Sequence, residues 1–257
     1  MDALLDLMIG GTVLDAGGFA LLAGVSFLGS FIAGALGLGG GGLVLATMAM
    51  VLPPVVLIPI HGVVQLGSNL GRAILLARQV LASVLPAFFI GTLIGAGVGG
   101  QLVITLPTPL LKALLAIFIL YTVWAPKFQA TKPGKATFFG VGVAGAFVTM
   151  FVGATGPLVA PFAAAASDER QRVVATHAAL MVIQHGLKIV AFGLLGFAFG
   201  PYVPLLVVLL ACGFAGTWCG RQVLDKLPER VFRVGLKTII TVLSLKLLYD
   251  AARATFG

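Results

Sequence analysis

Residues 16–71 read AGGFALLAGVSFLGSFIAGALGLGGGGLVLATMAMVLPPVVLIPIHGVVQLGSNLG, and none of these 56 residues is charged. A helix of about 20 residues crosses the hydrocarbon core of a bilayer, so a run of this length must turn within the membrane or at its edge. The run lacks the alternation typical of strands, and in lipid only helices and closed barrels pair all their backbone groups. We therefore expect helices that cross a membrane.

The composition of the whole chain supports this interpretation. Of the 257 residues, 60% are hydrophobic and 9% are charged, whereas a soluble domain has about 25% charged residues. Further uncharged runs cover residues 79–111, 136–167 and 189–220. A soluble enzyme, a disordered chain and a peripheral domain with one anchor are excluded. The predicted fold class is an all-α polytopic membrane protein.

Glycine and proline divide the chain into apolar segments, because these residues end or kink helices. The expected segments are 17–36, 41–52, 55–77, 80–105 and 109–125 in the first half, and 137–153, 157–167, 174–199, 204–221 and 229–250 in the second. The basic stretch between Lys127 and Lys135 separates the two halves. We predict a first repeat over 1–126, a cytoplasmic linker over 127–136 and a second repeat over 137–257.

The two halves share spaced residues, which indicates a duplication. Gly95, Gly99, Gln101, Leu106 and Pro107 recur 121 positions later, as Gly216, Gly220, Gln222, Leu227 and Pro228. His61 and His177 correspond at an offset of 116. Positive charges gather on the cytoplasmic side of membrane proteins, and their positions here favour two inverted repeats. Each repeat would contain a broken or re-entrant helix pair, over 17–52 or 137–167, followed by three transmembrane helices.

Both helix pairs are interrupted by small residues at membrane depth. Consecutive glycines disfavour a helix, and the N–H groups at a new helix N-terminus attract anions. On this basis Gly39, Gly40 and Gly41 in the first half, with Thr155 and Gly156 in the second, are candidate substrate-binding residues. The alternative is that the glycines serve close helix packing.

Two stripes of polar residues are the other candidate site. The first contains His61, Gln65, Asn69 and Arg72, and the second contains His177, Gln184, His185 and Lys188. Residues at these spacings share a helix face. Lipid offers them no hydrogen bonds, so we expect both stripes to face the protein interior. Alternatively, Arg72 extends its side chain to the interface and the histidines serve packing.

The residues that are absent narrow the chemistry further. No Asp or Glu lies between Asp15 and Asp168, or between Glu169 and Asp225. Cation carriers and proton relays usually need such a carboxylate. The chain has no P-loop motif, and Cys212 and Cys219 lack the spacing of a metal site. We therefore expect an anion as cargo, with no catalytic residues, no metal and no cofactor.

The sequence resembles the sulfite exporter TauE/SafE family over roughly residues 30–250. In the first half the resemblance rests on GALGLGGGGLVL at 34–45, Leu-Pro-Pro at 52–54 and Gly-Ser-Asn at 67–69. In the second half it rests on GATGPLVAPF at 153–162, Asp-Glu-Arg at 168–170 and Val-Ala-Thr-His at 174–177. The chain departs from the family pattern at Ala46-Thr47, where a proline is common, and in carrying His61 and Gln65.

The resemblance implies a multi-pass permease of the bacterial inner membrane that carries sulfite, organosulfonates or related sulfur-containing anions, often outward. We expect transport by alternating access, the partners being the anion and the lipid bilayer, without nucleic acid. A homo-oligomer is left open. Two other functions are also left open: an anion channel, and an intramembrane enzyme or assembly factor that uses the buried histidines.

Overall fold

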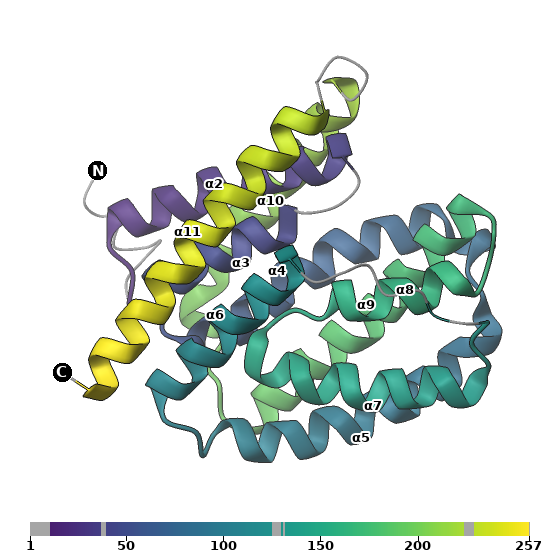
Figure 1. Ribbon diagram of the computed structural model, residues 1–257, viewed down its shortest axis with the longest axis horizontal. Helices are drawn as coiled ribbons and strands as arrows, with labels where there is room; N and C mark the ends of the chain where they lie inside the picture. The colour runs from purple at the N-terminus through teal and green to yellow at the C-terminus, as the bar shows by residue number, and fades with distance from the viewer. Residues whose placement is uncertain (1–10, 37–39, 125–129, 131, 224–228, 257) are drawn as a thin grey trace. The chain divides into compact units, whose positions relative to one another are not determined.

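The computed structural model describes residues 11–36, 40–124, 130, 132–223 and 229–256, and every regular element in these residues is helical (Figure 1). The α-helices are α2 (Ala16–Leu36), α3 (Gly40–Val51), α4 (Pro54–Leu75), α5 (Leu85–Val103), α6 (Thr108–Trp124), α7 (Lys135–Val152), α8 (Gly156–Ala165), α9 (Arg170–Leu194), α10 (Val203–Val223) and α11 (Glu229–Phe256). Three short 3-10 turns are η1 (Ala77–Gln79), η2 (Ala82–Val84) and η3 (Gly200–Tyr202).

Within the residues that the structure describes, five stretches are long and apolar enough to cross a membrane. They are Pro54–Leu75, Ala82–Val103, Lys135–Val152, Arg170–Leu194 and Gly200–Gly220. The prediction of an all-α polytopic membrane protein is confirmed. Several boundaries differ from those expected, because hydropathy follows apolar side chains, whereas helices are bounded by backbone geometry.

The ends of α9 illustrate the difference. The apolar segment was expected to begin at 174, but α9 begins at Arg170 and includes a polar first turn. It ends at Leu194, five residues before the expected end, where Gly196 adopts a positive φ of 91° and Phe197 N–H bonds to the Phe192 carbonyl. A left-handed glycine just after a helix is a common terminator.

The described contacts divide the chain into two compact units. The first comprises residues 1–60, 107–124 and 198–257, and the second comprises 61–106 and 125–197. Each unit takes segments from both sequence halves. The boundaries of the expected repeats, 1–126 and 137–257, are therefore not those of the compact units, and the repeat division stays a prediction.

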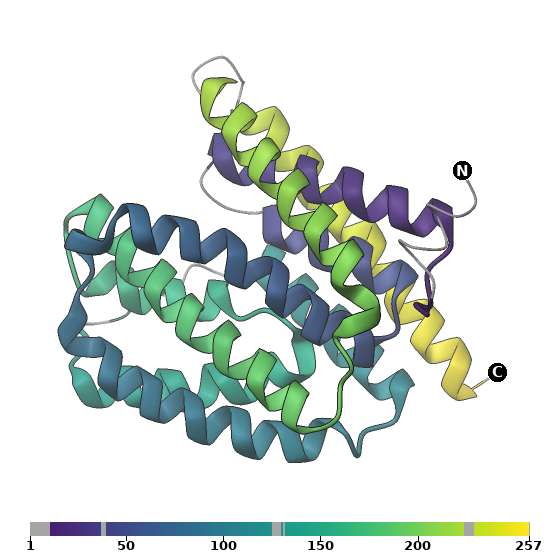
Figure 2. The same cartoon turned by 180° about the vertical axis from the view of Figure 1, so that it is seen from behind.

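The first unit is built around the pair α2 and α10, which lie side by side in both views (Figures 1 and 2). On α2 the fully buried Ser26 donates a 2.7 Å hydrogen bond to the Leu209 carbonyl of α10. Helix α11 packs against α6 and α3. At the surface Trp124 donates to the Thr241 hydroxyl over 2.9 Å.

The second unit is built around the pair α5 and α7, with α9 packed against α5 and α8 against α9. Its apolar core includes Phe88 of α5, Phe138 of α7, Val159 of α8 and Leu180 of α9, all fully buried. Of the candidate site residues, α8 holds Gly156, and α9 holds His177, Gln184, His185 and Lys188. Helix α4 contributes its part from His61 onward.

Glycines let the central pair of each unit approach closely. A Cβ on Gly95 of α5 would lie 2.1 Å from the Val143 carbonyl oxygen of α7, and one on Gly216 of α10 would lie 2.1 Å from the Phe27 carbonyl oxygen of α2. Gly95 and Gly216 differ by 121 positions, the offset of the repeated glycine motif. Phe27 and Val143 differ by 116, the offset of His61 and His177. The same contact thus occurs once within each unit.

The expected helix break in the second half lies between α7 and α8, at residues 153–155. The expected break in the first half falls at 37–39, which lies outside the described residues; α2 ends at Leu36 and α3 begins at Gly40.

Candidate functional site

The site is built on the joint between α7 and α8. Gly153 ends α7 with a positive φ of 76°, and its N–H bonds to the Thr149 carbonyl over 2.9 Å. Thr155 caps α8, and its carbonyl accepts hydrogen bonds from Leu158 and Val159. The last carbonyls of a helix have no partner within it. The joint therefore presents the Gly153 carbonyl, at the negative end of the α7 dipole.

A lysine side chain and a histidine side chain converge on the Gly153 carbonyl. Lys188 of α9 donates from Nζ to the Gly153 oxygen over 2.6 Å, and His61 of α4 approaches the same oxygen with Nδ1 at 3.2 Å. A carbonyl only accepts hydrogen bonds, so Nδ1 of His61 carries the hydrogen. Both side chains are fully buried.

Lys188 is buried and has no ion pair with any residue that the structure describes. The ion pairs found in the described part of the chain join Arg172 to Glu169 and Lys246 to Asp250. An ammonium group removed from water is costly unless other groups compensate for its charge. Here the compensation comes from the carbonyl at the end of α7.

A glycine on α4 makes room for this lysine. A Cβ on Gly62 would lie 2.7 Å from Cε and 3.4 Å from Nζ of Lys188. Any larger residue at 62 must displace the end of the lysine side chain. Gly62 is thus part of the geometry that directs Lys188 to Gly153.

Gln184 lies one turn before Lys188 on α9 and contacts both sides of the joint. Its Nε2 donates to the Gly145 carbonyl of α7 over 2.8 Å and to the Thr155 hydroxyl. The Thr155 hydroxyl itself donates to the Gly145 carbonyl over 3.3 Å. Gln184 is fully buried, and its Oε1 has no hydrogen-bond partner among the described residues.

Two further histidines belong to this cluster. The ring of His185 lies 6.5 Å from that of His61, in an edge-to-face arrangement. His185 is buried, and its Nδ1 has no hydrogen-bond partner within the described ranges. His177 donates from Nε2 to the Gly156 carbonyl over 3.2 Å, at the start of α8. His177 and Gly156 are both half-buried, so exposure increases from Lys188 toward His177.

The remaining polar residues of α4 bond mainly within their own helix. Arg72 donates to the Asn69 side chain over 3.0 Å and to the Ser68 carbonyl over 3.3 Å. Asn69 donates to the Gln65 carbonyl over 2.7 Å. Asn69 is buried, whereas Gln65 and Arg72 are half-buried. Arg72 lies in the last turn of α4.

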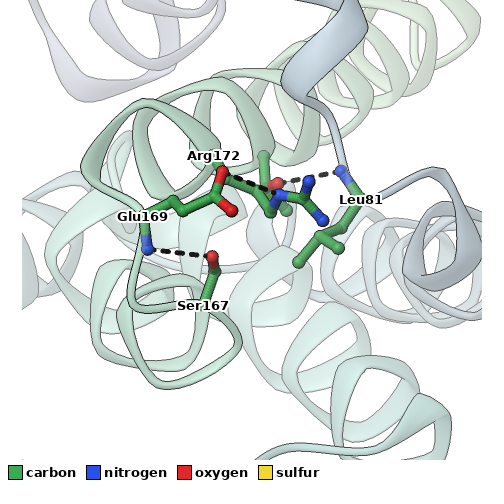
Figure 3. A network of polar contacts seen from close by, with 5 residues as sticks. Leu81, Ser167, Glu169 and Arg172 are labelled. Carbon is green, nitrogen blue, oxygen red and sulfur yellow. Dashed lines mark hydrogen bonds and ion pairs between the residues drawn. The ribbon is translucent and has the colours of Figure 1, made fainter.

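The start of α9 is held by a small polar network (Figure 3). Glu169 pairs with Arg172 over 3.5 Å, and the Glu169 N–H donates to the Ser167 hydroxyl over 3.1 Å. The Leu81 N–H donates to the hydroxyl of Thr176, the residue before His177, over 3.0 Å. The exposed ion pair contributes little stability. The Leu81–Thr176 bond fixes the first turns of α9 against the 77–84 segment.

The structure brings together seven of the thirteen predicted residues around the joint. They are His61, Thr155, His177, Gln184, His185 and Lys188, with Gly156 as the start of α8. Gln65, Asn69 and Arg72 lie farther along α4. Gly40 and Gly41 lie in the first turn of α3, in the other unit, and Gly39 lies outside the described residues.

Sequence reasoning missed three glycines of this cluster. They are Gly62, Gly145 and Gly153, which contribute space or a carbonyl oxygen rather than a side chain. Gly153 had a signal, since it stands in the Gly-Ala-Thr-Gly-Pro break. Gly62 and Gly145 had no such signal, because a glycine in an apolar helix does not indicate which side chain of another helix packs against it.

Several apolar helices, a broken helix pair and a buried polar cluster around Lys188 define a polytopic membrane protein of the transporter type. The chain belongs to the sulfite exporter TauE/SafE family, whose sequence model matches residues 22–247. The prediction of this family from the sequence is confirmed. Comparison with curated proteins and with solved structures gives no match.

Proposed function

We propose that this protein is a secondary transporter that exports sulfur-containing anions, such as sulfite or organosulfonates, across the bacterial inner membrane. Membership of a sulfite exporter family supports this substrate class. The bound anion would contact Lys188 and the groups around the α7–α8 joint. Gln65, Asn69 and Arg72, with Gly39, Gly40 and Gly41, stay proposed contributors to the anion path.

One observation carries the proposal. Lys188 is completely buried, yet it contacts a backbone carbonyl rather than a carboxylate. A buried cation that has no carboxylate partner among the described residues is suited to bind a negative solute, because the solute compensates its charge. Backbone N–H groups add to this attraction. The Gly156 amide lies in the first turn of α8, where amides have no partner within the helix.

Export agrees with the charge of the cargo. A membrane potential that is negative inside contributes about 2.3 kcal/mol per charge per 100 mV and drives anions outward. Such export needs no coupling ion. In uptake the potential would oppose the anion, and co-transported protons would be required.

Alternating access would follow from two repeats that move relative to each other. The equivalent close contacts, Gly95 with Val143 and Gly216 with Phe27, support a duplication. The positions of the positive charges favour an inverted orientation of the second repeat. The broken pair α7–α8 would be the element that opens the site, since its joint already departs from helical geometry.

The test is flux into and out of proteoliposomes under an imposed potential. A panel of sulfite, sulfate, methanesulfonate and taurine is offered to purified protein and to protein-free vesicles. A carrier shows saturation and counterflow, in which unlabelled anion on one side drives labelled anion from the other. Flux without saturation or counterflow would instead identify an anion channel. The proposal would be overturned if vesicles that contain the protein transport none of these anions.

A further inference from the structure

We infer that this site selects singly charged anions that donate a hydrogen bond, and that Gln184 recognises the donated hydrogen. The inference rests on the proposed function and narrows its substrate class, since a site that requires an O–H donor favours hydrogensulfite over organosulfonates whose oxygens only accept. The ligand class is a monovalent oxyanion with an O–H group, such as hydrogensulfite. Two independent properties of the cluster lead to it.

The first property is the number of buried positive charges. Among the described residues, Lys188 is the one lysine or arginine whose side chain is fully buried. Arg72 is half-buried and bonds to Asn69 and Ser68 on its own helix. One ammonium compensates one negative charge. A doubly charged anion would leave the second charge buried without compensation, at a high desolvation cost.

The second property is the fixed orientation of the Gln184 amide. Its Nε2 donates to two oxygen atoms, the Gly145 carbonyl and the Thr155 hydroxyl. Rotating the amide by 180° would place its oxygen against the Gly145 carbonyl, and neither atom donates a hydrogen. The orientation is therefore determined by the network, and Oε1 must occupy the remaining position.

This leaves an acceptor that needs a donor. Oε1 of Gln184 is buried and has no partner in the part of the chain that the structure describes. A buried acceptor without a partner is destabilising. A sulfate or sulfonate oxygen only accepts, so it would face Oε1 with a second lone pair. A protonated oxygen would donate to Oε1 while the anionic oxygens face Lys188, one helical turn away on α9.

The neighbouring His185 does not select for an O–H donor in the way that Gln184 does. Its Nδ1 is also buried without a partner in the described ranges. A neutral imidazole nitrogen donates in one tautomer and accepts in the other. His185 thus adapts to either kind of anion, whereas the carbonyl oxygen of Gln184 only accepts. The selectivity should therefore depend on Gln184.

The experiment compares pairs of anions that differ by a hydroxyl and a methyl group. Labelled hydrogensulfite competes with methanesulfinate at mildly acidic pH, and hydrogencarbonate competes with acetate, for counterflow in proteoliposomes. We expect wild-type protein to prefer the O–H member of each pair by about tenfold or more, because sites built around a hydrogen bond reject analogues that lack it. Gln184→Met should reduce the preference to about onefold. Gln101→Met, which alters an exposed glutamine at the end of α5, should leave it unchanged.

Each outcome is decisive. Equal transport of both members by the wild type overturns the inference but leaves the proposed transport intact. A preference that Gln184→Met retains also overturns it, since another group would then read the hydrogen. If vesicles that contain the protein transport no anion at all, the proposed function is overturned together with the inference. If Gln184→Met does not fold, the two wild-type competitions still decide, because the preference for O–H over methyl is itself the claim.

Discussion

The ammonium group of Lys188 donates a 2.6 Å hydrogen bond to the carbonyl oxygen of Gly153, at the residue where α7 ends. This carbonyl lies at the negative end of the α7 dipole, so the lysine stabilises the end of the helix. An anion that binds Lys188 competes with the carbonyl for the same ammonium. Within the proposed function, anion binding and release of the α7–α8 joint are therefore linked, because the Lys188 ammonium interacts with both the anion and the Gly153 carbonyl.

Replacing this lysine should remove transport without unfolding the protein. Lys188→Met keeps the volume of the side chain and removes its charge, and His61 still donates to the Gly153 carbonyl. Lys188 has no carboxylate partner among the described residues, so the substitution leaves no opposite charge buried and relieves the desolvation cost of the ammonium. We expect the thermal stability in detergent to be unchanged or raised, and anion counterflow to fall at least about 100-fold.

The matched control is Lys112→Met in α6, a half-buried lysine in the other unit. Its counterflow should stay close to that of the wild type. The Arg72→Ala, Lys188→Met double variant should be inactive as well. Normal transport by this double variant would show that the anion does not depend on either cation.

A methyl group on Gly62 should have the same functional effect from the facing helix. The added Cβ of Gly62→Ala meets Cε of Lys188 at 2.7 Å, and the lysine can yield because the contact involves the far end of a flexible chain. The fold should therefore survive while the ammonium moves away from Gly153. We expect counterflow to fall at least about tenfold, with a melting temperature near that of the wild type.

Gly71→Ala is the control on the same helix, because a Cβ at 71 meets no atom within 4 Å. It should retain transport and gain up to about 1 kcal/mol of helix stability. If both alanine variants lose activity equally, the effect comes from stiffening α4 and not from Lys188.

At Gly95, where α5 packs closely on α7, we expect substitution to reduce stability, whereas Gly62→Ala should reduce transport and leave stability unchanged. The Cβ of Gly95→Ala would lie 2.1 Å from the Val143 carbonyl oxygen, and backbone cannot yield as a side chain does. Forcing extra atoms into a packed interface costs about 1–3 kcal/mol or more. Gly95→Ala should therefore lower the melting temperature and the yield of folded protein. Gly97→Ala, two residues on and open to its surroundings, should do neither. Equal melting temperatures would contradict the close contact.

Much of the fold was predictable because it follows from local rules. The uncharged runs, together with breaks at glycine and proline, located the helices to within a few residues. The break at 153–155 was expected from Gly-Ala-Thr-Gly-Pro and is present. The exchange of helices between the sequence halves was not predictable, because it depends on contacts such as Gly95 with Val143, and a glycine gives no indication of its partner.

The candidate site was harder to predict, for a physical reason. The sequence indicates that a helix is broken, but not which of the two new ends a nearby cation will face. We expected backbone N–H groups to dominate, whereas Lys188 and His61 converge on a carbonyl. The offset of 116 also made His61 and His177 equivalent, yet His61 contacts Gly153, and His177 contacts Gly156 on the other side of the joint.

Substitutions at Thr155 test whether its hydroxyl positions the Gln184 amide or whether its side chain only fills space. It accepts a hydrogen bond from Gln184 and donates one to the Gly145 carbonyl, so it joins α8, α9 and α7 at one atom. Thr155→Val keeps the shape but removes the acceptor that fixes the Gln184 amide. The lost partner of a buried group costs about 1–3 kcal/mol. We expect a lower melting temperature, weaker anion counterflow and a smaller preference for hydrogensulfite over methanesulfinate.

Thr155→Ser should restore all three properties, because serine keeps the hydroxyl and loses only a methyl group. The serine variant is the informative control, since it creates a small cavity that the valine variant does not. If Thr155→Ser loses anion preference while Thr155→Val keeps it, the side chain at 155 acts by filling space. In that case the orientation of the Gln184 amide would have to be fixed by the Gly145 carbonyl alone.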